Sequence, residues 1–126
     1  MNRLLINGRP ETQIPFSDRG LHYGDGLFET IALRGGRLQF WQAHLQRMQL
    51  GCQRLGLPAI ETQQWLDDIG ALDATDDAVI KLMLTRGSGG RGYRAPNSVQ
   101  CTRAVAMYEM PGHIEARRAA GVKLHI

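Results

Sequence analysis

The chain has 126 residues, 43% of them hydrophobic and 21% charged, and its formal net charge is +3. This length supports one domain with its own hydrophobic core, and so small a net charge does not indicate a nucleic-acid partner. The sequence has no apolar run of signal-peptide or membrane-spanning length, and its two cysteines lack the spacing of metal ligands. We therefore expect a cytoplasmic protein with no membrane partner and no metal site.

The basic residues are unevenly divided between 13 arginines and two lysines. Arginine forms forked contacts with carboxylate and phosphate groups, so this bias is consistent with an anionic small-molecule partner. A GC-rich genome that favours arginine codons would produce the same bias.

The first third of the chain predicts short strands separated by turns. Residues 3–6 predict a strand that ends at the hairpin turn Asn7-Gly8. Residues 27–34 predict a second strand, followed by a glycine turn and a partner strand over residues 37–40. Because side chains alternate between the two faces of a strand, one face of the second strand carries Leu27, Glu29, Ile31 and Leu33.

The pattern becomes helical from Trp41. Apolar residues recur at helical spacing in Trp41, Leu45, Met48, Cys52 and Leu55. A second stripe borders this one and could reach into a cleft; it consists of His44, Arg47, Gly51 and Arg54. Glycine lowers helix stability by about 1 kcal/mol relative to alanine, so Gly51 indicates close approach of another backbone. The helix should end at Gly56 and Pro58, before a second helix over residues 60–69.

The remaining elements are a mixture of strands and one helix. Residues 78–85 form the clearest strand, with one wholly apolar face and with Lys81 in the middle of the other face. Further strands are predicted over residues 100–108 and 122–126, with a short helix over residues 114–120. Because the last strand ends with the chain, we expect the sequence to be part of a longer protein.

Two segments are unusually rich in glycine and charge: residues 17–30, interpreted as a loop that leads into a strand, and residues 85–93. Such segments are costly to order and often functional. The second matches G-x-G-x-x-G, but Pro96 prevents the helix that a dinucleotide site requires. A single copy between strands also argues against an RGG-type RNA contact. An anion-binding loop over a pocket fits better, and a plain connector stays an alternative.

Single residues carry weaker signals. Arg47 could be an ordinary surface arginine, but it lies beside His44 and Gly51 at the edge of the apolar stripe. Lys81 could extend from a sheet edge into water, and His22 could be a structural hydrogen-bonding group. No metal site or nucleophile–base pair is evident. The residue types alone therefore predict a pocket for an anion.

Three motifs make the chain similar to a known family. Residues 18–30 (DRGLHYGDGLFET) resemble the start of the fold-type IV pyridoxal-phosphate enzymes, which include branched-chain aminotransferases, D-amino acid aminotransferases and aminodeoxychorismate lyases. Residues 44–48 (HLQRM) resemble the segment that carries the family's phosphate-binding arginine. Residues 86–93 (RGSGGRGY) are similar to the aminodeoxychorismate lyases in particular. The resemblance covers essentially the whole chain.

The resemblance implies that residues 1–126 are the small N-terminal domain of such an enzyme, of the α/β (α+β) class, with a mainly antiparallel sheet flanked by helices. It implies pyridoxal 5'-phosphate as cofactor, with its phosphate bound by Arg47. The implied reaction is elimination of pyruvate from 4-amino-4-deoxychorismate to give 4-aminobenzoate, a step toward folate. The implied substrate-binding residues are Tyr23, Phe28, Lys81, Arg91 and Tyr93.

The family is homodimeric, which implies that Tyr23 serves the neighbouring subunit's site. Lys81 would lie near the substrate carboxylate, and Arg91 and Tyr93 would lie on a loop that closes over the substrate.

The chain departs from the family in one respect. The family's Schiff-base lysine and the acid that pairs with the pyridine nitrogen lie in a C-terminal domain, beyond residue 126, and neither Lys81 nor Lys123 matches the lysine motif. We therefore expect no catalytic residue in this chain and no activity from it alone. Two alternatives stay open: a branched-chain or D-amino acid aminotransferase, and a non-catalytic anion-binding or dimerisation module.

Overall fold

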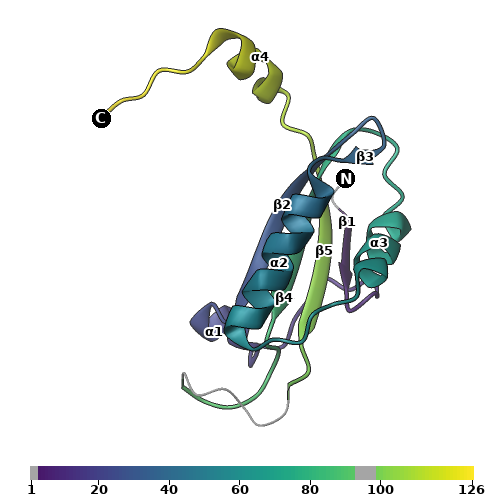
Figure 1. Ribbon diagram of the computed structural model, residues 1–126, viewed down its shortest axis with the longest axis vertical. Coiled ribbons are helices and arrows are strands. Elements are labelled where there is room, and N and C mark those ends of the chain that lie inside the picture. The colour runs from purple at the N-terminus through teal and green to yellow at the C-terminus, as the bar shows by residue number, and fades with distance from the viewer. Residues whose placement is uncertain (1–2, 93–98) are drawn as a thin grey trace.

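The computed structural model describes residues 3–92 and 99–126, which form a five-stranded antiparallel sheet with helices beside it (Figure 1). The strand order is β1-β5-β4-β2-β3, so the predicted antiparallel α+β architecture is confirmed. The strands are β1 (Arg3–Ile6), β2 (Gly26–Arg34), β3 (Arg37–Leu38), β4 (Ala78–Thr85) and β5 (Thr102–Glu109). The helices are α1 (Arg19–Tyr23), α2 (Trp41–Leu55), α3 (Thr62–Ala71) and α4 (His113–Ala120).

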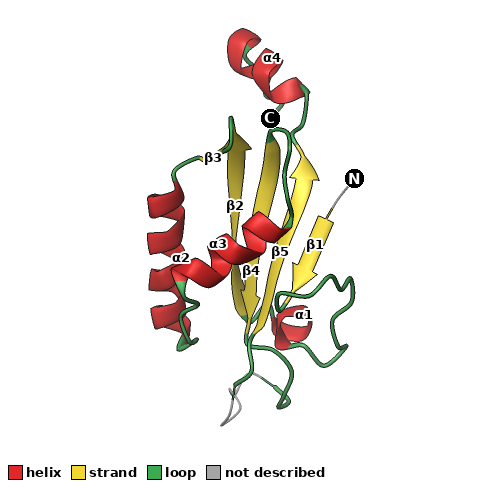
Figure 2. Cartoon of the chain, turned by 90° about the vertical axis from the view of Figure 1, so that its right-hand side faces the viewer, coloured by secondary structure: helices red, strands yellow, loops and turns green. Residues whose placement is uncertain are grey.

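The hydrophobic core lies between the sheet and helices α2 and α3, which cover the same face (Figure 2). Strand β4 confirms its predicted pattern, since its four apolar inner residues are all buried. The α2 stripe is buried at its centre but not at Leu55, which is 39% exposed at the end of the helix. Burial of this continuous apolar layer is the main force that holds the helices on the sheet. The core residues include Leu45, Met48, Cys52, Trp65, Ile31, Ile80, Leu82 and Val105.

Two glycines that the sequence analysis singled out, one at the end of α2 and one in its middle, have clear structural reasons. Gly56 ends α2 in the left-handed conformation at φ 67°, where its N–H donates to the last carbonyls of the helix. In the middle of α2, a Cβ on Gly51 would lie 2.8 Å from Leu27 Cδ2. Gly51 therefore permits close packing of α2 on β2, although the neighbour is a side chain rather than the backbone that the sequence suggested.

Two predictions from the sequence are wrong. The loop predicted ahead of the strand at Leu27 is not continuous, because Asp18 accepts a hydrogen bond from the Gly20 N–H at 2.8 Å and starts the short helix α1. Residues 122–126 are not a strand. A strand needs a partner for its backbone groups, and the described part of the chain offers none to this segment, which extends away from the sheet beyond α4 (Figure 1).

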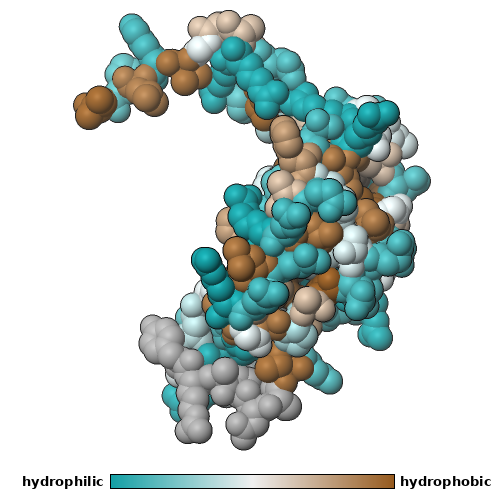
Figure 3. Space-filling model, viewed as in Figure 1, coloured by the Kyte–Doolittle hydropathy of each residue, from teal (hydrophilic) through white to brown (hydrophobic). Residues whose placement is uncertain are grey.

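Hydrophobic side chains are exposed on this C-terminal segment, and Figure 3 shows them on the arm that projects from the body of the molecule. Leu124 is 85% exposed, and Val122 is 65% exposed. Strand β3 is also shorter than predicted and pairs with β2 only at Leu33 and Arg34, so most of β2 is an edge of the sheet. None of the helices in the described ranges is long and apolar enough to cross a membrane.

Candidate functional site

A buried carboxylate on β2 organises the polar stripe of α2. Glu29 is 4% exposed on the inner face of the strand, and its side chain meets Arg47 and His44. Arg47 donates from Nε to Oε1 at 2.6 Å and from Nη2 to Oε2 at 2.7 Å. His44 Nδ1 lies 2.7 Å from Oε2 and donates to it when Glu29 is ionised. Figure 2 shows how α2, which carries both partners, runs along this side of the sheet.

This arrangement orients Arg47 as an anion-binding group. The hydrogen bonds from Arg47, together with those from His44, lower the pKa of Glu29 below its ordinary value despite burial of the carboxylate. An ionised Glu29 fixes one edge of the guanidinium, while the Arg47 side chain is 72% exposed. The Nη1 group makes no hydrogen bond within the described residues and stays available for a second, forked contact. The donor set therefore fits a phosphate group.

A cavity of about 430 Å³ opens beside this ion pair at the free edge of β2. Arg47 and Arg54 come from the same face of α2, with Gly51 between them, and Phe28 contributes from β2. The cavity thus combines two guanidinium groups with an apolar wall, a lining suited to an anionic ligand that has a flat organic part. Its residues are Leu27, Phe28, Glu29, Arg47, Met48, Leu50, Gly51 and Arg54.

The structure brings some of the predicted site residues together. Phe28 lies on the outer face of β2, is 63% exposed, and lines the same cavity as Arg47. Lys81 comes from the neighbouring strand β4, and its Nζ lies 4.7 Å from the centre of the Phe28 ring. Phe28 thus contacts Lys81 on the outer face of the sheet and lines the cavity that Arg47 also lines. Lys81 is half-buried and forms no ion pair with a carboxylate among the described residues.

The other predicted residues belong to the glycine segment. Tyr23 ends α1, and its hydroxyl accepts a hydrogen bond from the Gly92 N–H at 2.6 Å. Arg91 is exposed on the same segment, with no side-chain hydrogen bond within the described residues. Tyr93 lies outside the described residues, so its predicted role stays a prediction. The structure therefore connects Tyr23 to this segment and does not place it beside Arg47.

A second buried polar cluster joins the two glycine-rich segments, and the sequence did not reveal it. Arg19 and Arg86 both donate from Nε to Oδ2 of Asp25, each at 2.9 Å. Burial alone would raise the pKa of Asp25, but the hydrogen bonds from Arg86 and Arg19 outweigh it and lower the pKa below its ordinary value. Asp18 is fully buried and accepts from Thr102 Oγ1 at 2.7 Å. These charges tie α1 to the ends of β4 and β5.

One signal for the missed residue Glu29 was present in the sequence. It alternates with Leu27, Ile31 and Leu33 on a face that must be buried, where an unpaired carboxylate would be costly. A charge in that position requires a cationic partner, and the second stripe of α2 supplies one.

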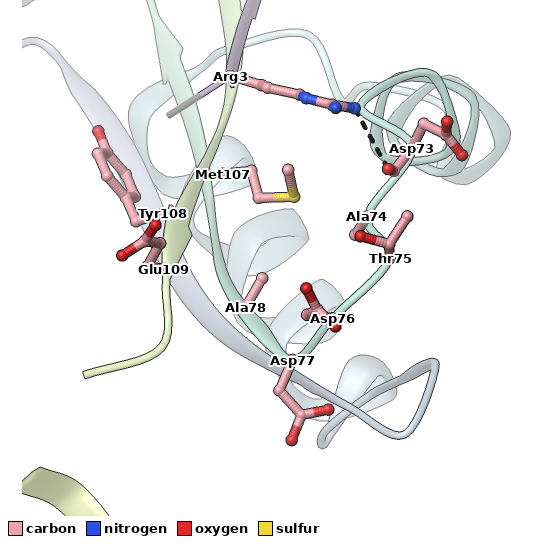
Figure 4. A pocket seen from close by; sticks show the side chains of 10 residues that line it. All are labelled: Arg3, Asp73, Ala74, Thr75, Asp76, Asp77, Ala78, Met107, Tyr108 and Glu109. Carbon is pink, nitrogen blue, oxygen red and sulfur yellow. Dashed lines mark hydrogen bonds between the residues drawn. The ribbon is translucent and has the colours of Figure 1, made fainter. Parts of the chain in front are cut away.

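A smaller cavity of about 180 Å³ lies at the opposite end of β4 (Figure 4). Arg3 extends from β1 to the turn after α3, where its Nη1 donates to the Asp73 carbonyl at 3.2 Å. The side chains of Asp76, Asp77 and Glu109 also line it. Within the described ranges, however, no group of three or more His, Cys, Asp or Glu side chains is placed to hold a metal ion.

The comparisons with known proteins identify the family of the chain. A family model for amino-transferase class IV matches residues 26–126, which is most of the chain and includes both β2 and α2. The chain belongs to the class IV aminotransferase family. Members of this family include pyridoxal-phosphate enzymes.

Within the class IV family, two similar proteins are lyases. Aminodeoxychorismate lyase of Vibrio harveyi is 38% identical over 125 residues, which cover 96% of this chain and 45% of the relative. The crystal structure of 4-amino-4-deoxychorismate lyase from Pseudomonas aeruginosa superposes with a TM-score of 0.85 at 37% identity, again over 96% of this chain and 45% of the other. The predicted resemblance to this branch of the family, and to its N-terminal fold, is confirmed.

A third class IV relative has two activities in its name. The bifunctional aminodeoxychorismate lyase / D-amino acid transaminase of Mycobacterium tuberculosis is 29% identical over 105 residues, covering 79% of this chain and 34% of the relative. The chain therefore spans less than half the length of each of these three relatives. Their similarity favours the lyase over the transaminase alternative.

Proposed function

We propose that the protein to which this chain belongs is a pyridoxal-phosphate-dependent 4-amino-4-deoxychorismate lyase, and that residues 1–126 are its N-terminal small domain. The observation that carries the proposal is the 38% identity to a lyase across 96% of the chain. The reaction removes pyruvate from 4-amino-4-deoxychorismate and leaves 4-aminobenzoate, which places the enzyme in folate synthesis. The cytoplasmic location expected from the sequence stays part of this proposal.

Arg47 is the proposed ligand of the cofactor phosphate. When bound, the cofactor supplies an electron sink for charge that develops on the substrate. Glu29 holds two of the arginine's nitrogens at 2.6 and 2.7 Å, so the group is oriented before the anion arrives. Phe28 then forms the apolar wall beside the cofactor and substrate. The catalytic lysine of the family is proposed to lie beyond residue 126.

The substrate has two carboxylates, and the chain offers cations for them. Lys81 lies on the open face of the sheet beside Phe28, within reach of a ligand bound at that edge. A lysine binds a carboxylate as a point charge, with less directional preference than an arginine. Arg91, with Tyr93, is proposed to contact the substrate from the glycine segment. Tyr23 is proposed to act at the site of the second subunit of a homodimer.

The test uses the whole protein, loaded with pyridoxal phosphate and given 4-amino-4-deoxychorismate. Release of 4-aminobenzoate and pyruvate in equal amounts is expected. A parallel assay with D-alanine and 2-oxoglutarate tests the transaminase alternative, an activity that the name of the bifunctional relative includes. Transamination without 4-aminobenzoate would refute the lyase proposal. Failure to bind the cofactor at all would favour the non-catalytic anion-binding module.

A matched pair of variants tests the role of Arg47. Arg47→Ala is expected to weaken pyridoxal-phosphate binding about tenfold to a hundredfold, the effect of losing one or two charge-assisted hydrogen bonds. Arg117→Ala removes an exposed helical arginine of α4 and should leave the affinity unchanged. Equal affinities in the two variants would contradict the assignment. Sedimentation velocity of the whole protein tests the proposed homodimer.

A further inference from the structure

We propose that Arg19 is a positioning residue that sets the conformation of the glycine segment Gly87–Gly92 and thereby the affinity for the substrate. The inference about the substrate rests on the lyase function proposed above. The inference about the segment rests on the contacts of Arg19 alone.

Arg19 contacts the segment at three of its carbonyl groups. Its guanidinium donates from Nη1 to the Gly92 carbonyl at 2.9 Å and to the Gly89 carbonyl at 3.5 Å. Its backbone N–H donates to the Gly87 carbonyl at 2.8 Å. Because these carbonyls span the segment from its first residue to its last, Arg19 restrains the path of the whole segment. Its backbone N–H acts at Gly87, and its side chain acts at Gly89 and Gly92.

Arg19 is itself held in place, which is what a positioning residue requires. Its side chain is 2% exposed, and Asp25 accepts its Nε hydrogen bond at 2.9 Å. Asp25 is fixed in turn by Arg86, whose Nη2 donates to the Leu55 carbonyl at the end of α2. The glycine segment is thereby connected through charged groups to the helix that carries Arg47.

Tyr23 holds the segment from a second direction. The Arg19 guanidinium carbon lies 4.8 Å from the centre of the Tyr23 ring. The Tyr23 hydroxyl accepts the Gly92 N–H, while the Gly92 carbonyl accepts from Arg19. Both polar groups of Gly92 are thus bound by the Arg19–Tyr23 pair. A residue held at both groups cannot leave this position without breaking two hydrogen bonds.

The geometry requires an arginine rather than any cation. Nε donates to the Asp25 carboxylate, and Nη1 donates to carbonyls of the glycine segment. The two nitrogens are held at a fixed separation within one planar group. A lysine has a single ammonium nitrogen, which cannot reproduce two donor nitrogens held at the fixed spacing and in the plane of a guanidinium. The substitution Arg19→Lys therefore keeps the charge and removes the connection.

Hydrogen exchange in the whole protein measures the restraint directly and does not depend on activity. Arg19→Lys is expected to speed amide exchange in peptides that cover residues 86–92 by about tenfold, the effect of losing one charge-assisted hydrogen bond. The matched control is Arg103→Lys, which alters a partly buried arginine–aspartate pair between β5 and α3, with Nε 2.7 Å from Asp68. This control should leave exchange in residues 86–92 at the wild-type rate.

Steady-state kinetics of the same variants measure the functional consequence. Arg19→Lys is expected to raise KM for the substrate about tenfold while kcat changes less than threefold and the cofactor affinity stays constant. A general loss of structure would instead lower kcat and cofactor affinity together. Asp25→Asn, which keeps the shape of the side chain and weakens both arginine contacts, should give the same pattern in milder form and replaces Arg19→Lys if that variant does not fold.

The outcomes separate this inference from the proposed function. Faster exchange in residues 86–92 of a protein without lyase activity would support the positioning role and refute only the lyase proposal. Wild-type exchange in Arg19→Lys would overturn the positioning role, whatever the activity. Faster exchange with an unchanged KM would overturn its connection to substrate affinity.

Discussion

Helix α1 is pressed against β4 at Gly20, and substitution of this glycine should destabilise the protein. A Cβ added at Gly20 would lie 2.4 Å from Cγ2 and 2.9 Å from Cβ of Thr85. Carbon atoms in contact are ordinarily separated by about 3.5–4.0 Å, so both contacts are repulsive. Thr85 cannot easily move, because it is β-branched and its Oγ1 accepts the Gly87 N–H at 3.0 Å.

Two opposing effects decide whether Gly20→Ala raises or lowers the free energy of unfolding. Alanine favours a helix over glycine by at most about 1 kcal/mol. Insertion of a methyl group into a packed contact costs about 1–3 kcal/mol. The Cβ would also approach Asp18 Oδ1 to 3.0 Å, at the atom that caps α1. We therefore expect a net destabilisation of about 1–2 kcal/mol.

Urea unfolding of the variants measures this effect. Gly70→Ala in α3 is the matched control, because an added Cβ there meets no atom within 4 Å apart from its chain neighbours and the backbone of its own helix. This variant should raise the free energy of unfolding by about 0.5–1 kcal/mol. Thr85→Ser removes the methyl group that causes the closest contact and keeps Oγ1. In the double variant it should restore about 1 kcal/mol of the loss caused by Gly20→Ala. A Gly20→Ala protein as stable as the wild type would refute the reasoning.

Three further predictions follow from the buried charges and thiols. Glu29→Gln should weaken pyridoxal-phosphate binding in the whole protein about tenfold, because the amide cannot accept both hydrogen bonds of Arg47; titration of the cofactor-free protein measures this. The lowered pKa values of Glu29 and Asp25 stabilise the fold fully above their ordinary values of 4.5 and 3.8, and this contribution disappears as the pH falls through the lowered values. Urea unfolding across pH 2–6 should therefore show an acid loss of stability that is smaller in Glu29→Gln, and equal slopes would contradict it. Burial raises the pKa of Cys52 and Cys101, so both thiols should react slowly with alkylating reagents at pH 7 until the chain is unfolded, as mass spectrometry would show.

The sequence predicted those parts of the fold that depend on local periodicity. The apolar faces of residues 78–85 and 27–34 and the centre of the α2 stripe appear in the structure as predicted, because burial imposes a period of two on strands and 3.6 on helices. The position of Arg47 beside the core followed from the same spacing. Its partner Glu29 was overlooked, although a carboxylate on an otherwise apolar strand face was visible.

The contacts of α1 could not be predicted in this way. Arg19 and Asp25 are close in the sequence, but Arg86 lies 61 residues beyond Asp25, and no periodic pattern relates them. The prediction of a strand over residues 122–126 failed for the opposite reason. The alternation of apolar and polar residues there is suited to a strand, but a strand forms only where a neighbouring strand supplies hydrogen bonds. Pairing partners are a property of the assembled sheet rather than of the segment.

The strand order has a consequence for how the protein is made. Strand β1 contains the first described residues, yet its only partner strand in the described chain is β5, with Leu4 opposite Ala106. During synthesis the N-terminal strand must therefore wait until more than a hundred residues have been added before it can pair. Contacts between such distant residues form late and slowly, because closing a long loop costs entropy before the contact stabilises it. In the nascent chain Leu4, Leu5 and Ile6 stay exposed through most of translation, and this segment is where chaperones would be expected to act first.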